Sequence, residues 1–329
     1  MPSLRSRLVK QGLVTSVRVL RARGDGAPDP TGPMEDLEAY ALRMRAQMEE
    51  MGNRVRLPRT ASWEACEMPG VLGEWVTDER AGDTDRVVFH VHGGAYAMGS
   101  PRSHRGLAAA LSRTAHAPVL LPEYRLAPEH VYPAALDDVV TAWRWLVEVH
   151  GTPTERIAVS GDSAGGGLGL SLLVRLRDEG LPLPGCYVGM SPWTDLAGTG
   201  ESLRDLDGID PWLSAGLVAP AARAYAGAHA LDDPGVSPLY ADLAGLPPML
   251  VHVGSDEILR DDARRLVTRA REAGVDASLG EFAGLWHVFQ AFPGVPESRQ
   301  ALREIGAFMR RHTGGDAVSG AASSEPRSA

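Results

Sequence analysis

One glycine-flanked serine forms the pattern in this sequence that points most directly to chemistry. Ser163 lies in Gly161-Asp162-Ser163-Ala164-Gly165, directly after a short β-branched and apolar run. Glycine on both sides permits a backbone turn too tight for larger residues, and a serine at the apex of such a strand-to-helix turn presents its hydroxyl above the sheet. The small residues that follow predict a helix whose N-terminus would favour an anion there. We therefore predict that Ser163 is a nucleophile; an ordinary glycine-rich turn is the alternative.

A serine hydroxyl needs a base within hydrogen-bond reach, and the base needs an acid to orient it. Asp256 and His287 each follow a predicted strand, as Ser163 does, and loops at the carboxyl ends of parallel strands share one crevice. The order Ser, Asp, His is that of an α/β-hydrolase triad. Taken singly, His287 could be a surface histidine and Asp256 a helix cap. Other carboxylates enter or lie within the next helix, where we expect capping or surface roles: Glu257, Asp261 and Asp262.

A second glycine-rich loop follows an apolar run over residues 85–92 that is typical of a central strand. It reads His92-Gly93-Gly94-Ala95. Backbone N–H groups in such a loop can converge on one point, as a developing oxyanion requires. Alone, this loop could equally be a tight turn after a strand.

The composition limits the classes of partner. The chain of 329 residues has a net charge of −9 and an isoelectric point near 5.6, which argues against nucleic acid or an anionic membrane as the main partner. Cys66 and Cys186 are the only cysteines, so we expect no disulfide framework and no metal cluster. No stretch approaches the roughly 20 apolar residues that span a bilayer, and no signal peptide is evident. We expect a cytoplasmic bacterial protein.

Strand and helix patterns alternate along most of the chain, which predicts an α/β fold with a mostly parallel central sheet flanked by helices. Residues 196–236 break this alternation with short helices and turns, and we expect them to pack with the N-terminal helices as a helical cap. The predicted divisions are 1–54 for N-terminal helices forming part of the cap, 55–195 for the first part of the core, 196–236 for the cap insertion, 237–312 for the second part of the core, and 313–329 for a disordered tail.

Six segments between about residues 85 and 290 resemble one known family: His92-Gly93-Gly94-Ala95, Tyr124-Arg125-Leu126-Ala127-Pro128-Glu129, Gly161-Asp162-Ser163-Ala164-Gly165-Gly166, Ser191-Pro192-Trp193, Gly254-Ser255-Asp256 and His287. Together they are similar to the hormone-sensitive-lipase family of α/β-hydrolases, also called bacterial family IV esterases. The resemblance implies an α/β-hydrolase fold with a helical cap.

For the site, the resemblance implies Ser163 as nucleophile, His287 as base and then acid, and Asp256 as the residue that orients His287. It also implies an oxyanion hole made by the backbone N–H groups of Gly93, Gly94 and Ala164, with His92 bracing the loop. Ala95 departs from the family pattern, which has a third glycine in its place. If that position has positive φ, alanine costs about 1–2 kcal/mol of strain there.

The expected function is hydrolysis of short- to medium-chain carboxylic esters through an acyl-enzyme, with a small-molecule ester as partner and without metal or cofactor. A lactone hydrolase or an N- or O-deacetylase of a secondary metabolite would use the same triad, and a homodimer is left open. A non-catalytic receptor, like the plant gibberellin receptors, would lack His287, and a related peptidase would lack the two loop motifs. Six large residues could line the pocket or belong to the core: Tyr96, Met98, Trp193, Trp212, Leu213 and Trp286.

Overall fold

An eight-stranded sheet forms the centre of the computed structural model, which describes residues 2–22, 34–54, 56–82, 84–211 and 213–315. The strand order is β1-β2-β4-β3-β5-β6-β7-β8, and only the β1–β2 and β2–β4 pairs are antiparallel. The predicted mostly parallel sheet is therefore confirmed. The strands are β1 (Ala61–Met68), β2 (Val71–Asp78), β3 (Val87–Val91), β4 (Val119–Glu123), β5 (Ile157–Asp162), β6 (Cys186–Met190), β7 (Met249–Gly254) and β8 (Ala277–Phe282).

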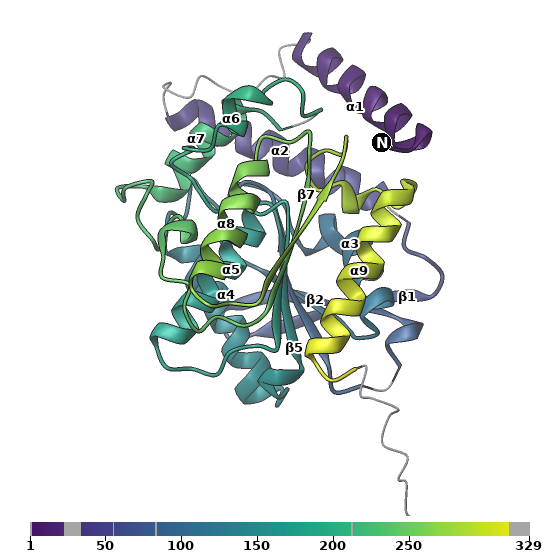
Figure 1. Ribbon diagram of the computed structural model, residues 1–329, viewed down its shortest axis with the longest axis vertical. Coiled ribbons are helices and arrows are strands. Elements are labelled where there is room, and N and C mark those ends of the chain that lie inside the picture. The colour runs from purple at the N-terminus through teal and green to yellow at the C-terminus, as the bar shows by residue number, and fades with distance from the viewer. Residues whose placement is uncertain (1, 23–33, 55, 83, 212, 316–329) are drawn as a thin grey trace, which may run out of the picture.

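The four central parallel strands consist of buried residues throughout, as expected for strands covered on both faces. One face packs against α4 (Ala134–Arg144), α5 (Ala164–Asp178) and α8 (Arg260–Glu272). The other face packs against α3 (Pro101–Ala115) and α9 (Pro296–His312), which lie side by side (Figure 1). Short turns complete the chain: 3₁₀ segments Glu79–Ala81, Thr154–Arg156, Pro238–Tyr240 and Phe289–Ala291, and a π-helical turn Trp145–Val149 that continues α4.

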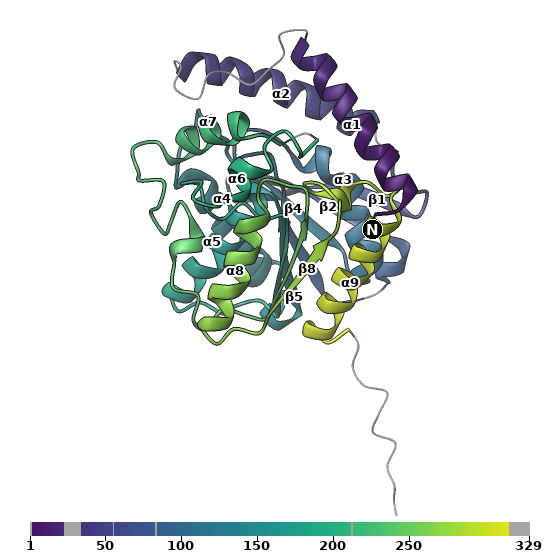
Figure 2. The same cartoon turned by 45° about the horizontal axis from the view of Figure 1, so that its top comes forward.

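Four further helices lie together at one end of the sheet (Figure 2). They are α1 (Leu4–Ala22), α2 (Met34–Arg54), α6 (Ser202–Asp205) and α7 (Ala215–Ala226). The helix α2 contacts both α3 and α7, and α1 contacts α9. The division into cap and core stays a prediction, and residues 316–329 of the predicted tail lie outside the described residues. Among the helices that the structure describes, none is both long and apolar enough to cross a membrane.

A glycine sets the distance between α3 and α9. A Cβ atom added at Gly306 of α9 would lie 2.3 Å from the carbonyl oxygen of Thr114 in α3. Real Cβ atoms do not approach backbone oxygen this closely, so any side chain at Gly306 would push the two helices apart. Gly306 itself is buried, and the contact joins the helices near the C-terminal end of α3.

Replacing Gly306 with alanine should lower the free energy of unfolding by about 1–3 kcal/mol, the usual cost of overpacking a close contact. Gly216→Ala in α7 is the matched control, because a Cβ atom there meets no other atom within 4 Å. We expect the control to be neutral or slightly stabilising, since alanine favours a helix over glycine by roughly 0.5–1 kcal/mol. Urea denaturation of both variants measures the difference. Equal stability of the two variants would contradict the close contact.

Candidate active site

A strained turn places Ser163 at the end of β5 and the start of α5. Its φ and ψ are 53° and −126°, outside the ordinary helical and strand regions. Its N–H donates to the carbonyl of Met190 and its carbonyl accepts from the N–H of Trp193, both at 2.9 Å. A Cβ atom on Gly161 would lie 2.3 Å from the carbonyl oxygen of Gly165, and one on Gly165 would lie 2.1 Å from that of Val91. The turn thus requires both flanking glycines.

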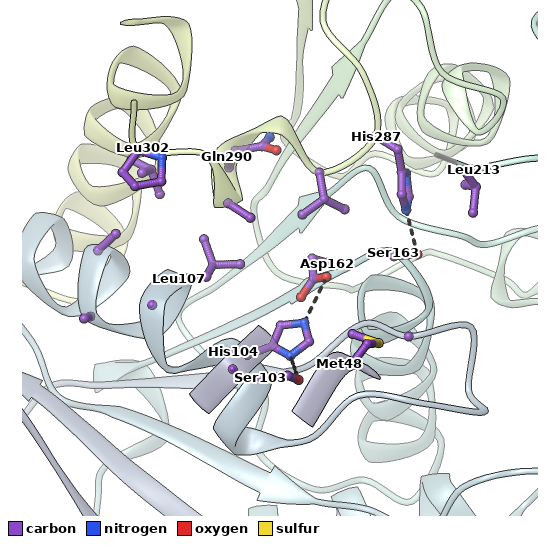
Figure 3. Close-up of a pocket in the computed structure, with 18 of the residues that line it drawn as sticks. Met48, Ser103, His104, Leu107, Asp162, Ser163, Leu213, His287, Gln290 and Leu302 are labelled. Atoms are coloured by element: carbon purple, nitrogen blue, oxygen red, sulfur yellow. Dashed lines mark hydrogen bonds and ion pairs between the residues drawn. The ribbon is translucent and has the colours of Figure 1, made fainter. Parts of the chain in front are cut away.

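His287, in the loop between β8 and α9, faces this serine. Its Nε2 lies 2.9 Å from Ser163 Oγ, and both residues are buried (Figure 3). On its other side, its Nδ1 lies 3.3 Å from Oε1 of Glu257. A hydroxyl, an imidazole and a carboxylate therefore form one continuous chain.

The carboxylate beside His287 is that of Glu257, and the expectation that Asp256 occupies this place is wrong. Glu257 is fully buried, and its Oε2 accepts hydrogen bonds from the Ser191 hydroxyl and the Gly254 N–H, each at 2.8 Å. Asp256 points elsewhere and forms an ion pair of 2.6 Å with Lys10 of α1. Neighbouring residues of this loop face different directions. Glu257 therefore points into the interior toward His287, whereas the preceding Asp256 points to a partly exposed surface.

Ser191 links the carboxylate to the histidine loop. Besides donating to Glu257, its hydroxyl accepts the N–H of Val288, the residue after His287, at 3.0 Å. Ser191 is completely buried and has a φ of 49°. Ser191 belongs to one of the motifs named above, but the sequence alone assigned it no role. Its two hydrogen bonds join three loops that are far apart in the sequence, so residue spacing could not reveal them.

The pKa of His287 is raised above its ordinary value. Burial alone would lower it, because a low-dielectric interior disfavours the imidazolium. The hydrogen bond and negative charge of Glu257 outweigh that effect.

In the glycine-rich loop after β3, one of the N–H groups expected in the oxyanion hole points elsewhere. The N–H of Gly93 donates to Asp162 Oδ1 at 3.1 Å, so the expectation that it faces the nucleophile is wrong. Gly94 and Ala95 instead line the cavity beside Ser163. Ala164 is the first residue of α5, where a helix has no internal acceptor for its N–H. Within the described part of the chain, no acceptor lies in hydrogen-bond reach of the N–H groups of Gly94, Ala95 or Ala164.

The backbone of this loop is held in an unfavourable region. Gly94 has a φ of 126°, and a Cβ atom there would lie 2.0 Å from the carbonyl oxygen of Met98. Ala95 and Tyr96 have φ of 54° and 59°. Ala95 therefore carries the strain of about 1–2 kcal/mol that the sequence predicts for a positive φ.

A buried carboxylate supports the loop from below. Asp162 Oδ1 lies 3.2 Å from His90 Nε2, and Oδ2 lies 3.5 Å from His104 Nε2. Burial opposes the ionisation of Asp162, but the charges and hydrogen bonds of the two histidines outweigh burial and hold its pKa well below the usual range. The pKa of His104 is raised in turn, because the Asp162 charge outweighs burial. The anchor for Gly93 is thus ionised Asp162.

His92 braces the same loop without charge. Its Nδ1 lies 2.8 Å from the carbonyl oxygen of Gly93, and its ring stacks on Tyr124 with centroids 4.2 Å apart. Burial lowers its pKa to about 3. The Tyr124 hydroxyl donates to the carbonyl of His92 at 2.8 Å, which ties this loop to the motif that begins at Tyr124.

A cavity of about 1800 Å³ opens above Ser163 and His287. Of the residues expected to line it, Met98 and Leu213 do so. Tyr96, Trp193 and Trp286 do not: they are 1%, 3% and 0% exposed and belong to the core. Tyr96 stacks on Tyr225 with centroids 3.8 Å apart, and Trp286 packs edge-on against Phe292. Trp212 lies outside the described residues.

Metal-ligating side chains do not gather in the residues that the structure describes: no group of three or more His, Cys, Asp or Glu could hold an ion. Cys66 and Cys186 are both buried free thiols, as expected of small apolar residues.

Comparison with known proteins places this arrangement in a family. A family model described as alpha/beta hydrolase fold matches residues 88–291. An acetyl-hydrolase of Streptomyces hygroscopicus is 43% identical over 242 residues, covering 73% of this chain and 80% of the relative. A carboxylesterase/phospholipase of Mycobacterium tuberculosis is 37% identical over 275 residues, covering 80% and 70%. The crystal structure of an esterase from the bacterial hormone-sensitive-lipase family superposes with a TM-score of 0.83 at 40% identity, covering 95% of this chain and 99% of the other.

The contact between Glu257 and His287 predicts how the histidine titrates. Glu257→Gln removes the charge that raises the pKa of His287 and leaves the burial that lowers it, so the pKa should fall. Asp256→Asn is the matched control in the adjacent residue and should leave that pKa within a few tenths of the wild-type value. NMR titration of the His287 ring measures both. If the pKa of His287 fell in Asp256→Asn and not in Glu257→Gln, Asp256 would be the residue that orients His287, as the sequence predicts.

Proposed function

Because the chain belongs to the hormone-sensitive-lipase family of α/β-hydrolases and is a carboxylesterase-type hydrolase, we propose that it cleaves esters through an acyl-enzyme formed on Ser163. The observation that carries this proposal is the chain of contacts from Ser163 Oγ to His287 and on to Glu257. The intact histidine argues against a receptor that only binds its ligand.

In the first half of the reaction, Ser163 Oγ attacks the ester carbonyl carbon while His287 Nε2 takes the hydroxyl proton. The carbonyl oxygen becomes an oxyanion, and we assign its donors as the N–H groups of Gly94, Ala95 and Ala164. One such preorganised donor lowers a barrier by about 2.7–4 kcal/mol. The imidazolium then protonates the leaving alkoxide, the alcohol departs, and an acyl-enzyme remains.

In the second half, His287 takes a proton from water, and the resulting hydroxide attacks the acyl carbonyl. Collapse of this intermediate expels Ser163 Oγ, which recovers its proton from the imidazolium as the acid product leaves. Through its contact with Nδ1, Glu257 fixes the tautomer with the proton on that nitrogen and stabilises the imidazolium. Ser191 is a positioning residue, because it is fully buried and acts through its contacts with Glu257 and the histidine loop.

The acyl group that we propose is short to medium in length. Relatives named acetyl-hydrolase support small acyl groups, and the same chemistry would serve an O-deacetylase. The cavity is larger than such an acyl group needs, since pockets for drug-sized ligands measure roughly 300–1,000 Å³. Most of the space is thus left for the rest of the substrate.

Hydrolysis of p-nitrophenyl esters from acetate to palmitate tests the proposal. Wild-type protein should cleave the short and medium esters best, and Ser163→Ala should lose at least about 10³-fold in kcat, because no nucleophile remains. Ser278→Ala, at an exposed position of β8, is the control for serine removal. Turnover retained by folded Ser163→Ala protein would exclude the acyl-enzyme.

The pH dependence of kcat/KM should have an acid limb set by His287. Protonated imidazole cannot accept the serine proton, so activity is present above the raised pKa of His287 and is lost as the pH falls through it. Glu257→Gln should move this limb to lower pH and reduce kcat by about 10²–10⁴-fold. Asp256→Asn should do neither, and steady-state kinetics across the pH range decides between the two carboxylates.

A further inference from the structure

The cavity continues from the catalytic residues into a groove between α3 and α9. Its α3 wall carries residues three or four positions apart, which form one face of that helix: Ser103, Gly106, Leu107, Ala110, Arg113 and Thr114. Its α9 wall has the same spacing: Arg299, Leu302, Arg303, Ala307 and Arg310. Figure 3 shows Leu107 and Leu302 approaching this space from the two helices.

The groove has an apolar middle, and its two walls close on each other toward one end. Small and apolar residues line its middle: Gly106, Leu107, Ala110, Leu302 and Ala307. Toward the C-terminal end of α3 the two helices close on each other, since Gly306 meets Thr114 at backbone contact distance. From Ser103 to Arg113 the α3 wall runs ten residues, or about 15 Å at the rise of an α-helix. A linear chain attached to the reacting ester could therefore extend along it.

Arginines line this groove and its rim. Arg113 and Arg303 come from the two walls, and Arg299 lies one turn before Arg303 on α9. Arg56 and Arg80 reach it from the ends of neighbouring segments; the 3₁₀ turn holding Arg80 packs against α3. All of these are exposed.

These guanidinium groups form none of the carboxylate pairs that several other arginines of the protein form. Arg105, Arg125 and Arg264, for example, each form a bidentate pair with a carboxylate. Among the described residues, no carboxylate lies within 4 Å of the guanidinium of Arg56, Arg80, Arg113, Arg299 or Arg303, and none of these groups donates a hydrogen bond. In a chain of net charge −9, such a gathering of unpaired positive charge is a local reversal of sign. An anion placed there would relieve the repulsion and accept several charge-assisted hydrogen bonds.

We propose that the groove between α3 and α9 binds a linear apolar chain of the ester substrate, and that its arginines bind an anionic group, a carboxylate or a phosphate, at the far end of that chain. This inference rests on the proposed ester hydrolysis, since the chain must lead from the group that reacts at Ser163. The anion can belong to the acyl side or to the alcohol side of the ester, and the two cases give different results below.

Two matched pairs of esters test the groove. On the acyl side, p-nitrophenyl decanoate is compared with the mono-p-nitrophenyl ester of sebacic acid, which has the same length and a free carboxylate. On the alcohol side, decyl acetate is compared with the acetate ester of an ω-hydroxydecanoate. Wild-type protein should show a kcat/KM about fivefold or more higher for the charged member of one pair, as expected of a few partly exposed ion pairs. Added salt should reduce the preference.

The double variant Arg113→Gln/Arg303→Gln should bring the ratio of charged to neutral kcat/KM close to one. Arg311→Gln is the matched control, because Arg311 lies on the same helix and outside the groove. A preference confined to the acyl pair or to the alcohol pair identifies the side that carries the anion. Equal rates for both members of both pairs, or a preference that survives in the double variant, would overturn the inference.

Hydrolysis of p-nitrophenyl butyrate, whose chain is too short to reach the arginines, separates the two proposals. If the wild type cleaves butyrate but shows no charge preference, the groove inference alone fails. If it cleaves no ester, the proposed function fails, and calorimetric binding of sebacate then tests the groove directly. Binding that weakens in the double variant and persists in Arg311→Gln would support the site; equal binding or no binding would refute it.

Discussion

The site depends on the close approach of backbone segments beneath Ser163. The carbonyl oxygens of Gly165 and Val91 lie where Cβ atoms of Gly161 and Gly165 would be, so β3, β5 and the start of α5 meet without side chains between them. This contact forces Ser163 to a φ of 53°, and each non-glycine residue in such a conformation costs about 1–3 kcal/mol. Six described non-glycine residues have positive φ, and five of them surround the site: Ala95, Tyr96, Ser163, Ser191 and Val288. Strain is therefore concentrated where the backbone has to present groups to a substrate.

Two buried carboxylates hold these strained segments in place. Asp162 fixes the glycine-rich loop through the N–H of Gly93, and Glu257 fixes the histidine loop through His287 and Ser191. Burying a carboxylate is costly unless hydrogen bonds and opposite charge compensate it, and here both kinds of partner are present. Asp162 contacts two histidines and accepts one backbone N–H, while Glu257 contacts one histidine and accepts from a hydroxyl and a backbone N–H. The two acids therefore act on different parts of the site.

Sequence patterns predicted the sheet, the tight turn at Ser163 and the position of His287, because these follow from local chemistry. Apolar runs specify buried strands, and paired glycines specify a close turn. Sequence patterns did not identify Glu257. Two carboxylates are adjacent in one loop, and the sequence does not show which of them turns inward toward His287. That direction is set by hydrogen bonds from Gly254 at the end of β7 and from Ser191, which lies 66 positions earlier in the chain.

The same limit explains the aromatic residues. The sequence predicts Tyr96 as a pocket residue. In the structure Tyr225, which is 129 positions further along the chain, stacks on Tyr96 and encloses it in the core. A sequence pattern shows that a side chain is apolar and that it lies near a functional loop. Whether it faces the substrate or the interior depends on distant segments that arrive only when the chain folds.

Asp256, which does not face His287, has a different structural role. Asp256 pairs with Lys10, the only lysine in the chain, and so ties α1 to the loop that carries Glu257. Ser3 and Ser6 make a second attachment, each donating to the carboxylate of Glu297 at the start of α9. Because both attachments are polar and partly exposed, they add little stability compared with the apolar contacts beneath the sheet. Val9 and Leu13 of α1 also pack against the buried cluster of Leu285, Trp286 and Phe289, so apolar contacts join this helix to the segment that carries His287.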